Sequence, residues 1–170
     1  MSINQHFIIG IVLLASGSSQ AQHGDTISVN KNVNHHCLFE ENSFTIGLGA
    51  TYSFQLEGMG VNSRLYYNVG EHVCFGSEFS YLKKGEESIY DISLIGHYIF
   101  ETKLVGIYPV LGANYTKESD EHESEEAFGA VFGGGIHRNF GKLTAFTEYT
   151  HIESTLRDDF VTLGLMINLK

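Results

Sequence analysis

The sequence is poor in charge, in proline and in tryptophan. Charged residues make up 18% of the 170 positions, proline occurs once, and tryptophan is absent. Soluble domains carry roughly 25% charged residues, so this protein has an unusual surface. The chain has only 10 Lys and Arg against 20 Asp and Glu, which gives a net charge of −10. This argues against a nucleic-acid partner, because a protein needs a basic face to bind one. Glycine (19), Phe (12) and Tyr (9) are plentiful instead, and this combination favours a β-protein over a helical bundle.

The chain also lacks an apolar run long enough for a membrane-spanning helix, which needs about 20 residues. The apolar run at 7–15 has nine residues, and small polar residues follow it up to Ser19-Gln20-Ala21. This order is typical of a secretory signal peptide with its cleavage site. We therefore expect a signal peptide at 1–21 and an N-terminal periplasmic tail at 22–42. The alternative is an N-terminal anchor helix.

From position 44 onward, apolar residues recur at every second position, which is the period of a β-strand. In the last segment Val161, Leu163 and Leu165 fall on one face, and Thr162 and Gly164 fall on the other. The alternation restarts after each short polar or glycine-containing break. It predicts eight strands, at 44–56, 59–69, 72–82, 89–100, 105–116, 127–137, 143–152 and 160–169.

The polar faces of these strands indicate which face meets water. Their only charges are Arg64, Glu78, Asp91 and Glu148, whereas a water-exposed surface is about 25–35% charged. Small residues fill most of the rest and suit a narrow barrel interior. The apolar faces carry no charge, and the strands match the roughly 9–11 residues that cross a bilayer. The sequence thus predicts an all-β fold, an eight-stranded antiparallel up-and-down transmembrane β-barrel at 43–170. A soluble lipocalin-type barrel, with its apolar face inside, is the alternative.

The connections fit a barrel whose two termini lie on the periplasmic side. We expect short periplasmic turns at 70–71, 101–104 and 138–142, and outer loops at 57–58, 83–88, 117–126 and 153–159. Aromatic residues fall toward the strand ends on the apolar face, where membrane barrels carry interfacial girdles. They are Tyr52, Tyr67, Tyr81, Tyr90, Tyr98, Phe100, Tyr115 and Tyr149.

With its signal peptide, eight alternating strands and final segment FVTLGLMINLK, the chain resembles the small outer-membrane β-barrels of the OmpA/OmpX type. The segments YPVLGANY and LTAFTEYTHIE are similar to strands of such barrels from Bacteroidetes-like bacteria. The resemblance implies an integral, monomeric protein of the Gram-negative outer membrane with a structural or surface-interaction role. Its implied partners are outer-membrane lipids, lipopolysaccharide and the barrel-assembly machinery. Lys170 departs from the aromatic residue that commonly ends these proteins.

Five polar side chains are expected to project into the lumen: Arg64, Glu78, Asp91, His97 and Glu148. Isolated buried charges are costly, so we expect them to pair in a network that plugs the barrel. Eight strands enclose a space that side chains alone can fill. A selective narrow pore, with these groups as its filter, is the alternative.

The two cysteines, Cys37 and Cys74, fall near the same end of the predicted barrel. A secreted protein permits a disulfide between them, worth roughly 4 kcal/mol for a loop of this size; two free thiols are the alternative. His35, His36 and Cys37 do not have zinc-like spacing. We predict no metal and no cofactor.

The predicted loop at 117–126 is strongly acidic. Divalent cations prefer oxygen ligands, so such cations are possible partners of this loop, although its spacing does not fit an EF-hand. The default interpretation is a solvated loop. Its acidic residues are Glu118, Asp120, Glu121, Glu123, Glu125 and Glu126.

Lipid A-modifying enzymes also use eight-stranded barrels, with His-x-Ser and a nearby carboxylate in the deacylases. His122 and Ser124 have that spacing but fall in the acidic loop, and His151 and Ser154 do not have it. A base and its nucleophile must lie within hydrogen-bond reach, which neither pair promises. We therefore predict a non-enzymatic barrel and keep the deacylase-like enzyme as the alternative.

Overall fold

The computed structural model describes residues 41–70, 72–102 and 104–169. The predicted signal peptide and nearly all of the tail lie outside these residues. Within them, no helix is long and apolar enough to cross a membrane. The described residues form strands β1 (Ser43–Ser53), β2 (Gly58–Asn68), β3 (Val73–Lys84), β4 (Glu87–Tyr98), β5 (Phe100–Glu101), β6 (Gly106–Ser119), β7 (Ser124–Phe140), β8 (Leu143–Glu153) and β9 (Asp158–Leu169).

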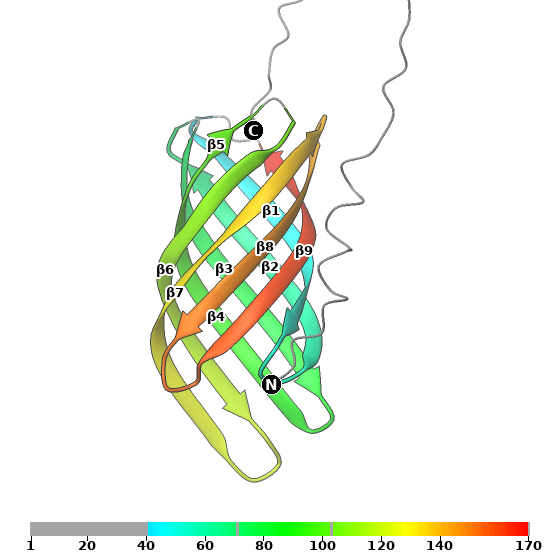
Figure 1. The fold of residues 1–170 in the computed structure, drawn as a ribbon, viewed down its shortest axis with the longest axis vertical. Helices are drawn as coiled ribbons and strands as arrows, with labels where there is room; N and C mark the ends of the chain where they lie inside the picture. The colour runs from blue at the N-terminus through cyan, green and yellow to red at the C-terminus, as the bar shows by residue number, and fades with distance from the viewer. Residues whose placement is uncertain (1–40, 71, 103, 170) are drawn as a thin grey trace, which may run out of the picture. The chain divides into compact units, whose positions relative to one another are not determined.

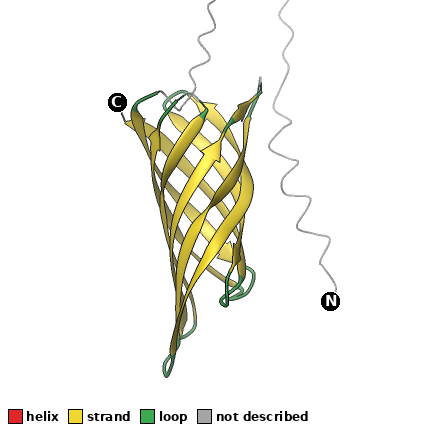
Figure 2. Ribbon diagram, turned by 90° about the vertical axis from the view of Figure 1, so that its left-hand side faces the viewer, coloured by secondary structure: helices red, strands yellow, loops and turns green. Residues whose placement is uncertain are grey.

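Eight long antiparallel strands close into a barrel (Figure 1). Each long strand pairs with the next one in the chain, and β1 pairs with β9, so that Phe44 lies opposite Leu169. The two-residue β5 extends the predicted fourth strand beyond Ile99, a buried residue at which the pairing is interrupted. Closure leaves no long strand with a free edge. The predicted eight-stranded antiparallel barrel is confirmed (Figure 2).

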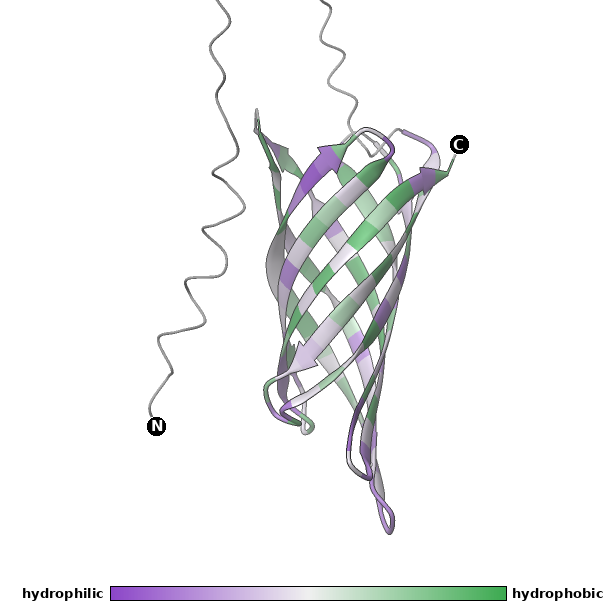
Figure 3. Cartoon of the chain, turned by 90° about the vertical axis from the view of Figure 1, so that its right-hand side faces the viewer, coloured by the Kyte–Doolittle hydropathy of each residue, from purple (hydrophilic) through white to green (hydrophobic). Residues whose placement is uncertain are grey.

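The side chains alternate along the strands, with apolar residues outside and polar residues inside. On β1, Phe44 and Leu48 are 49% and 71% exposed, whereas Thr45, Thr51 and Ser53 are buried. Green apolar segments alternate with pale and purple polar segments along the strands in Figure 3, and purple predominates in the long hairpin of β6 and β7. This facing is opposite to that of a lipocalin-type barrel.

Two glycines have conformations or contacts that a larger residue would disturb. Gly85 has a φ of +63° in the two-residue turn between β3 and β4, the backbone that tight hairpins need and that glycine adopts without strain. A Cβ atom on Gly47 would lie 2.7 Å from Cγ of Arg64 and 2.8 Å from Cγ of Met166. Gly47 thus leaves room for the arginine that crosses the lumen.

Four predicted connections are shorter than expected because the strands extend into them. The predicted loops 83–88 and 153–159 are reduced to 85–86 and 154–157. The predicted loop 117–126 is a turn at 120–123 only, since Lys117 pairs with Glu126 and Ser119 with Ser124 across β6 and β7. The predicted turn 138–142 is likewise reduced to 141–142. Paired strands in a hairpin are held by backbone hydrogen bonds and need no apolar face. The hydrophobic pattern alone therefore underestimated the lengths of these strands.

Candidate functional site

A charged cluster crosses the lumen at the level of Arg64 on β2. The Nη2 atom of Arg64 lies 3.2 Å from Oε2 of Glu78 on β3 and 3.2 Å from Oε1 of Glu148 on β8. Its Nε donates a hydrogen bond of 2.9 Å to Asn62, and its guanidinium lies 4.0 Å from the ring centroid of Phe146. All three charged side chains are almost fully buried. Arg64 therefore links carboxylates from opposite parts of the barrel wall.

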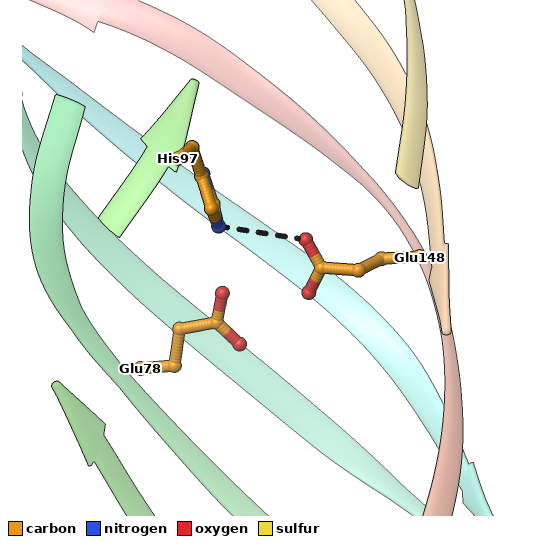
Figure 4. Close-up of side chains that lie close together, drawn as sticks. All are labelled: Glu78, His97 and Glu148. Atoms are coloured by element: carbon orange, nitrogen blue, oxygen red, sulfur yellow. Dashed lines mark ion pairs between the residues drawn. The ribbon is translucent and has the colours of Figure 1, made fainter. Parts of the chain in front are cut away.

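His97 of β4 joins this cluster. Its Nε2 atom lies 3.8 Å from Oε2 of Glu148, and Figure 4 shows Glu78 beside this pair. The imidazole ring contacts the rings of Tyr66 and Tyr108, with centroids 4.9 and 4.8 Å away. The Tyr66 hydroxyl also donates a hydrogen bond to Glu78. Sequence reasoning missed both tyrosines, although each occupies an inward-facing position of its strand.

Asp91 lies apart from the other four predicted lumen residues. Its Oδ1 atom accepts hydrogen bonds of 2.6 Å from Thr116 and 3.2 Å from Asn114. Its Oδ2 atom has no hydrogen-bond partner among the described residues. Asp91 and Glu78 both line a lumen cavity of about 20 Å³, which is room for about one water molecule. The five residues thus form two neighbouring groups.

Asp158, placed in a predicted outer loop, is a further buried acid. It is 3% exposed at the start of β9. Ser53 donates a hydrogen bond to its carboxylate, and the backbone N–H of Gln55 donates another of 2.9 Å. Asp158 therefore fastens the end of β1 to β9. Its position beside Asp159 in a charged stretch gave no sign of burial.

Cys74 of β3 faces the lumen and is completely buried. Among the described residues its thiol forms no disulfide, and its Sγ atom lies 3.6 Å from Nδ1 of His97. Cys37 lies outside the described residues, so the disulfide between the two cysteines stays a prediction.

The acidic residues of the long hairpin surround a groove at one rim of the barrel. Glu118, Asp120, Glu123 and Glu125 line this groove of about 350 Å³ together with Glu87 of β4. Glu121 lies at an adjoining hollow, and Glu126 pairs with Lys117 at 2.7 Å. The groove therefore contains four of the six predicted acids and one that the sequence did not single out.

Asp120 shapes the tip of the same hairpin. Its carboxylate accepts hydrogen bonds from the backbone N–H groups of His122 (2.8 Å) and Glu123 (2.7 Å). These bonds favour the charged form and hold the pKa of Asp120 below its ordinary value.

Neither candidate histidine–serine pair has the contacts of a catalytic base and nucleophile. The two ring nitrogens of His151 face carboxylates, at 2.7 Å from Asp159 and 3.2 Å from Glu153. Ser154 accepts a hydrogen bond from the N–H of Leu156, and Ser124 pairs with Ser119. His151 is therefore held as a link between strands β8 and β9.

Several of the predicted girdle aromatics lie on the outer face of the barrel. Tyr81 and Tyr90 pair across β3 and β4 with ring centroids 4.7 Å apart, and Tyr98 contacts Phe100 at 4.8 Å. Other exposed girdle residues are Tyr67 and Tyr149. Amphipathic rings of this kind suit the boundary between lipid and water.

No protein-family model and no curated protein sequence matches this chain. Solved structures do resemble it. The N-terminal β-barrel domain of Pseudomonas aeruginosa OprF has a TM-score of 0.66 at 17% identity, over 76% of this chain and 98% of that domain. Ail, the attachment invasion locus protein of Yersinia pestis, has a TM-score of 0.57 at 17% identity, over 76% of this chain and 99% of Ail.

Neisserial surface protein A is similar as well, with a TM-score of 0.55 at 16% identity, over 73% of this chain and 96% of that protein. The three similar structures and the closed barrel described above agree in architecture. The Bacteroidetes subtype stays a prediction. The chain therefore has the fold of the small eight-stranded outer-membrane β-barrels.

Proposed function

We propose that the protein is a monomeric integral outer-membrane β-barrel with a non-enzymatic, structural or surface-interaction role. The inverted placement of its side chains carries the proposal. Leu48, Leu94 and Leu111 are 71%, 65% and 69% exposed on three different strands, whereas Arg64 and Glu148 are buried. Lipid covers such an apolar belt, and a closed barrel satisfies its own backbone hydrogen bonds in a bilayer.

The proposed orientation follows from the two rims. The barrel begins at Ser43 and ends at Leu169 on one rim, which we assign to the periplasm. The long hairpin and its acidic groove lie at the opposite rim and would face the exterior. The barrel-assembly machinery would insert the chain, and lipopolysaccharide would surround its outer half.

The lumen is proposed to be closed to bulk conduction. Arg64 spans it between Glu78 and Glu148, and Tyr66, Tyr108 and Phe146 fill the space around them. Eight strands leave little room beyond their own side chains. The narrow-pore interpretation requires an open path past this cluster.

The outer groove is proposed to contact cationic groups. Five carboxylates line it, and divalent cations near lipopolysaccharide are suitable partners. Ail has been crystallised with the heparin analogue sucrose octasulfate. The acidic groove of this chain is lined by carboxylates and would repel a polysulfated ligand.

Electrophoresis of the outer-membrane fraction, boiled against unboiled, tests the proposal. A compact membrane barrel resists detergent until it is heated, so we expect the band to shift on boiling. Single-channel recordings should give no stepwise conductance, and the mass of lipid A should be unchanged on overexpression. An unshifted band, with the protein in the periplasm or medium, would overturn the proposal. Stepwise conductance would indicate a pore instead of a structural role. A change in the mass of lipid A would indicate an enzyme.

A further inference from the structure

The lumen has an excess of negative charge. Among the described residues the buried carboxylates are those of Glu78, Asp91, Glu148 and Asp158, and the buried basic group with a permanent charge is Arg64. Uncompensated charge in a barrel interior is costly. At the centre, Arg64 alone faces the two carboxylates of Glu78 and Glu148. With both carboxylates ionised, one more positive charge, from a cation or a proton, would balance the centre.

Side-chain geometry indicates where that charge can bind. Glu78, His97 and Glu148 each present one potential ligand atom, and these three atoms lie within 4.8 Å of one another. The Nε2 atom of His97 has no hydrogen-bond partner among the described residues, although its residue is only 6% exposed. This nitrogen points toward Glu148 at 3.8 Å, as Figure 4 shows. A buried ring nitrogen beside two carboxylates is a set of potential metal ligands, although both carboxylates also bind Arg64.

We propose that Glu78, His97 and Glu148 bind a divalent first-row transition-metal ion of the Zn²⁺ class. Imidazole nitrogen and carboxylate oxygen are ligands of such ions. Bonds of about 2.1 Å to a tetrahedral ion place ligand atoms roughly 3.4 Å apart. The His97–Glu148 separation is close to this value, and all three ligand atoms lie within 4.8 Å of one another, so metal binding requires Glu78 to move closer.

Neighbouring side chains hold the proposed ligands in position. The other ring nitrogen of His97 faces the thiol of Cys74, and the Tyr66 hydroxyl donates to Glu78. Such outer contacts orient metal ligands. Arg64 acts in the opposite sense, because it already binds both carboxylates and repels a second cation. The site therefore predicts moderate affinity in the native protein and higher affinity once Arg64 is neutral.

A direct test is Co²⁺ binding to the full chain refolded in detergent. His35, His36 and Cys37 are replaced in the parent and in every variant, so that the tail offers no histidine or cysteine ligands at these positions. Bound metal is measured by elemental analysis after gel filtration, and ligand-field absorption reports its coordination. The matched control is His137→Gln, because His137 is also buried in the lumen, where it stacks on Tyr108. The boiling shift verifies that each variant is folded.

We expect about one Co²⁺ per barrel in the parent and in His137→Gln. Affinity should fall roughly 100-fold in His97→Gln and rise at least about tenfold in Arg64→Met. Glu148→Gln serves as the second ligand variant if His97→Gln does not fold. Absence of binding by the parent, or equal binding by the ligand variants, overturns the proposal. Binding that develops only in Arg64→Met also overturns it, since Arg64 then excludes metal ions from the native lumen.

Discussion

Removal of the Arg64 guanidinium should strongly destabilise the barrel. Arg64→Met keeps an unbranched apolar stem but deletes the guanidinium that lies over Phe146, both ion pairs and the hydrogen bond to Asn62. Breaking a buried ion pair by removing one partner costs about 3–5 kcal/mol, because the other charge remains buried. Here two carboxylates lose their shared partner, so we expect a loss of about 4 kcal/mol in the free energy of unfolding.

Urea unfolding of the refolded barrel in lipid vesicles, with a chelator present to exclude metal ions, measures this loss. The matched control is the triple variant Arg64→Met, Glu78→Gln, Glu148→Gln, which removes the charges together. Its stability should return to within about 1–2 kcal/mol of the parent, since neutral buried partners carry a much smaller penalty. The reasoning would be refuted if Arg64→Met alone changed the free energy of unfolding by less than about 1 kcal/mol.

Three further predictions test the lipid face, the lumen packing and the outer hairpin. Leu111→Arg should lower the free energy of unfolding in lipid by about 2–4 kcal/mol if this position lies at mid-membrane. Glu121→Arg at the hairpin turn is the control and should have little effect. Equal effects of the two substitutions in urea unfolding would contradict the assignment of Leu111 to the lipid face. Gly47→Val should destabilise the barrel by about 1–3 kcal/mol through overpacking, because its Cβ would meet Arg64 and Met166. A urea unfolding midpoint equal to that of the parent would contradict this packing. The pKa of Asp120, measured by NMR, should lie below the ordinary value of about 3.9, because two N–H groups stabilise its charged form. Its contribution to the stability of the turn is therefore present above the unfolded-state pKa and lost as pH falls through the lower folded-state pKa. An unshifted pKa of Asp120 in the folded barrel would refute this.

The sequence was sufficient to predict the barrel because strand period and facing are local properties. Polar positions such as Thr45 and Thr51 alternate with Phe44 and Leu48, and one choice of phase determines which face is buried. The low charge on the polar faces then indicated that those faces are internal. No long-range information was needed for either step.

The charged cluster was predictable only in part. Arg64 and Glu78 lie directly opposite each other on adjacent strands, so their pairing follows once the hairpin register is known. Glu148 reaches Arg64 across the lumen, and that contact depends on barrel closure and strand stagger. Sequence alternation does not encode either quantity, which is also why the separate hydrogen bonds of Asp91 to Thr116 and Asn114 could not be predicted.

The hairpin and Asp158 show a second limit of the hydrophobic pattern. Strands β6 and β7 continue to Ser119 and from Ser124, although their ends are polar on both faces. Asp158 can be buried because Ser53 at the end of β1 and the backbone of Gln55 in the following turn satisfy its carboxylate. Both features depend on hydrogen bonds, which the hydrophobic pattern does not report.

The most direct test of the central claim uses the absence of tryptophan from the chain. Single tryptophans are introduced at Leu48, Leu94 or Leu111 on the outer face, and at Glu121 in the hairpin turn as the control. The protein is refolded into vesicles of ordinary or brominated lipid, and tryptophan fluorescence is compared. The account predicts strong quenching by brominated lipid at all three leucine positions and none at Glu121. Unquenched fluorescence at the leucine positions would contradict an apolar belt embedded in the membrane.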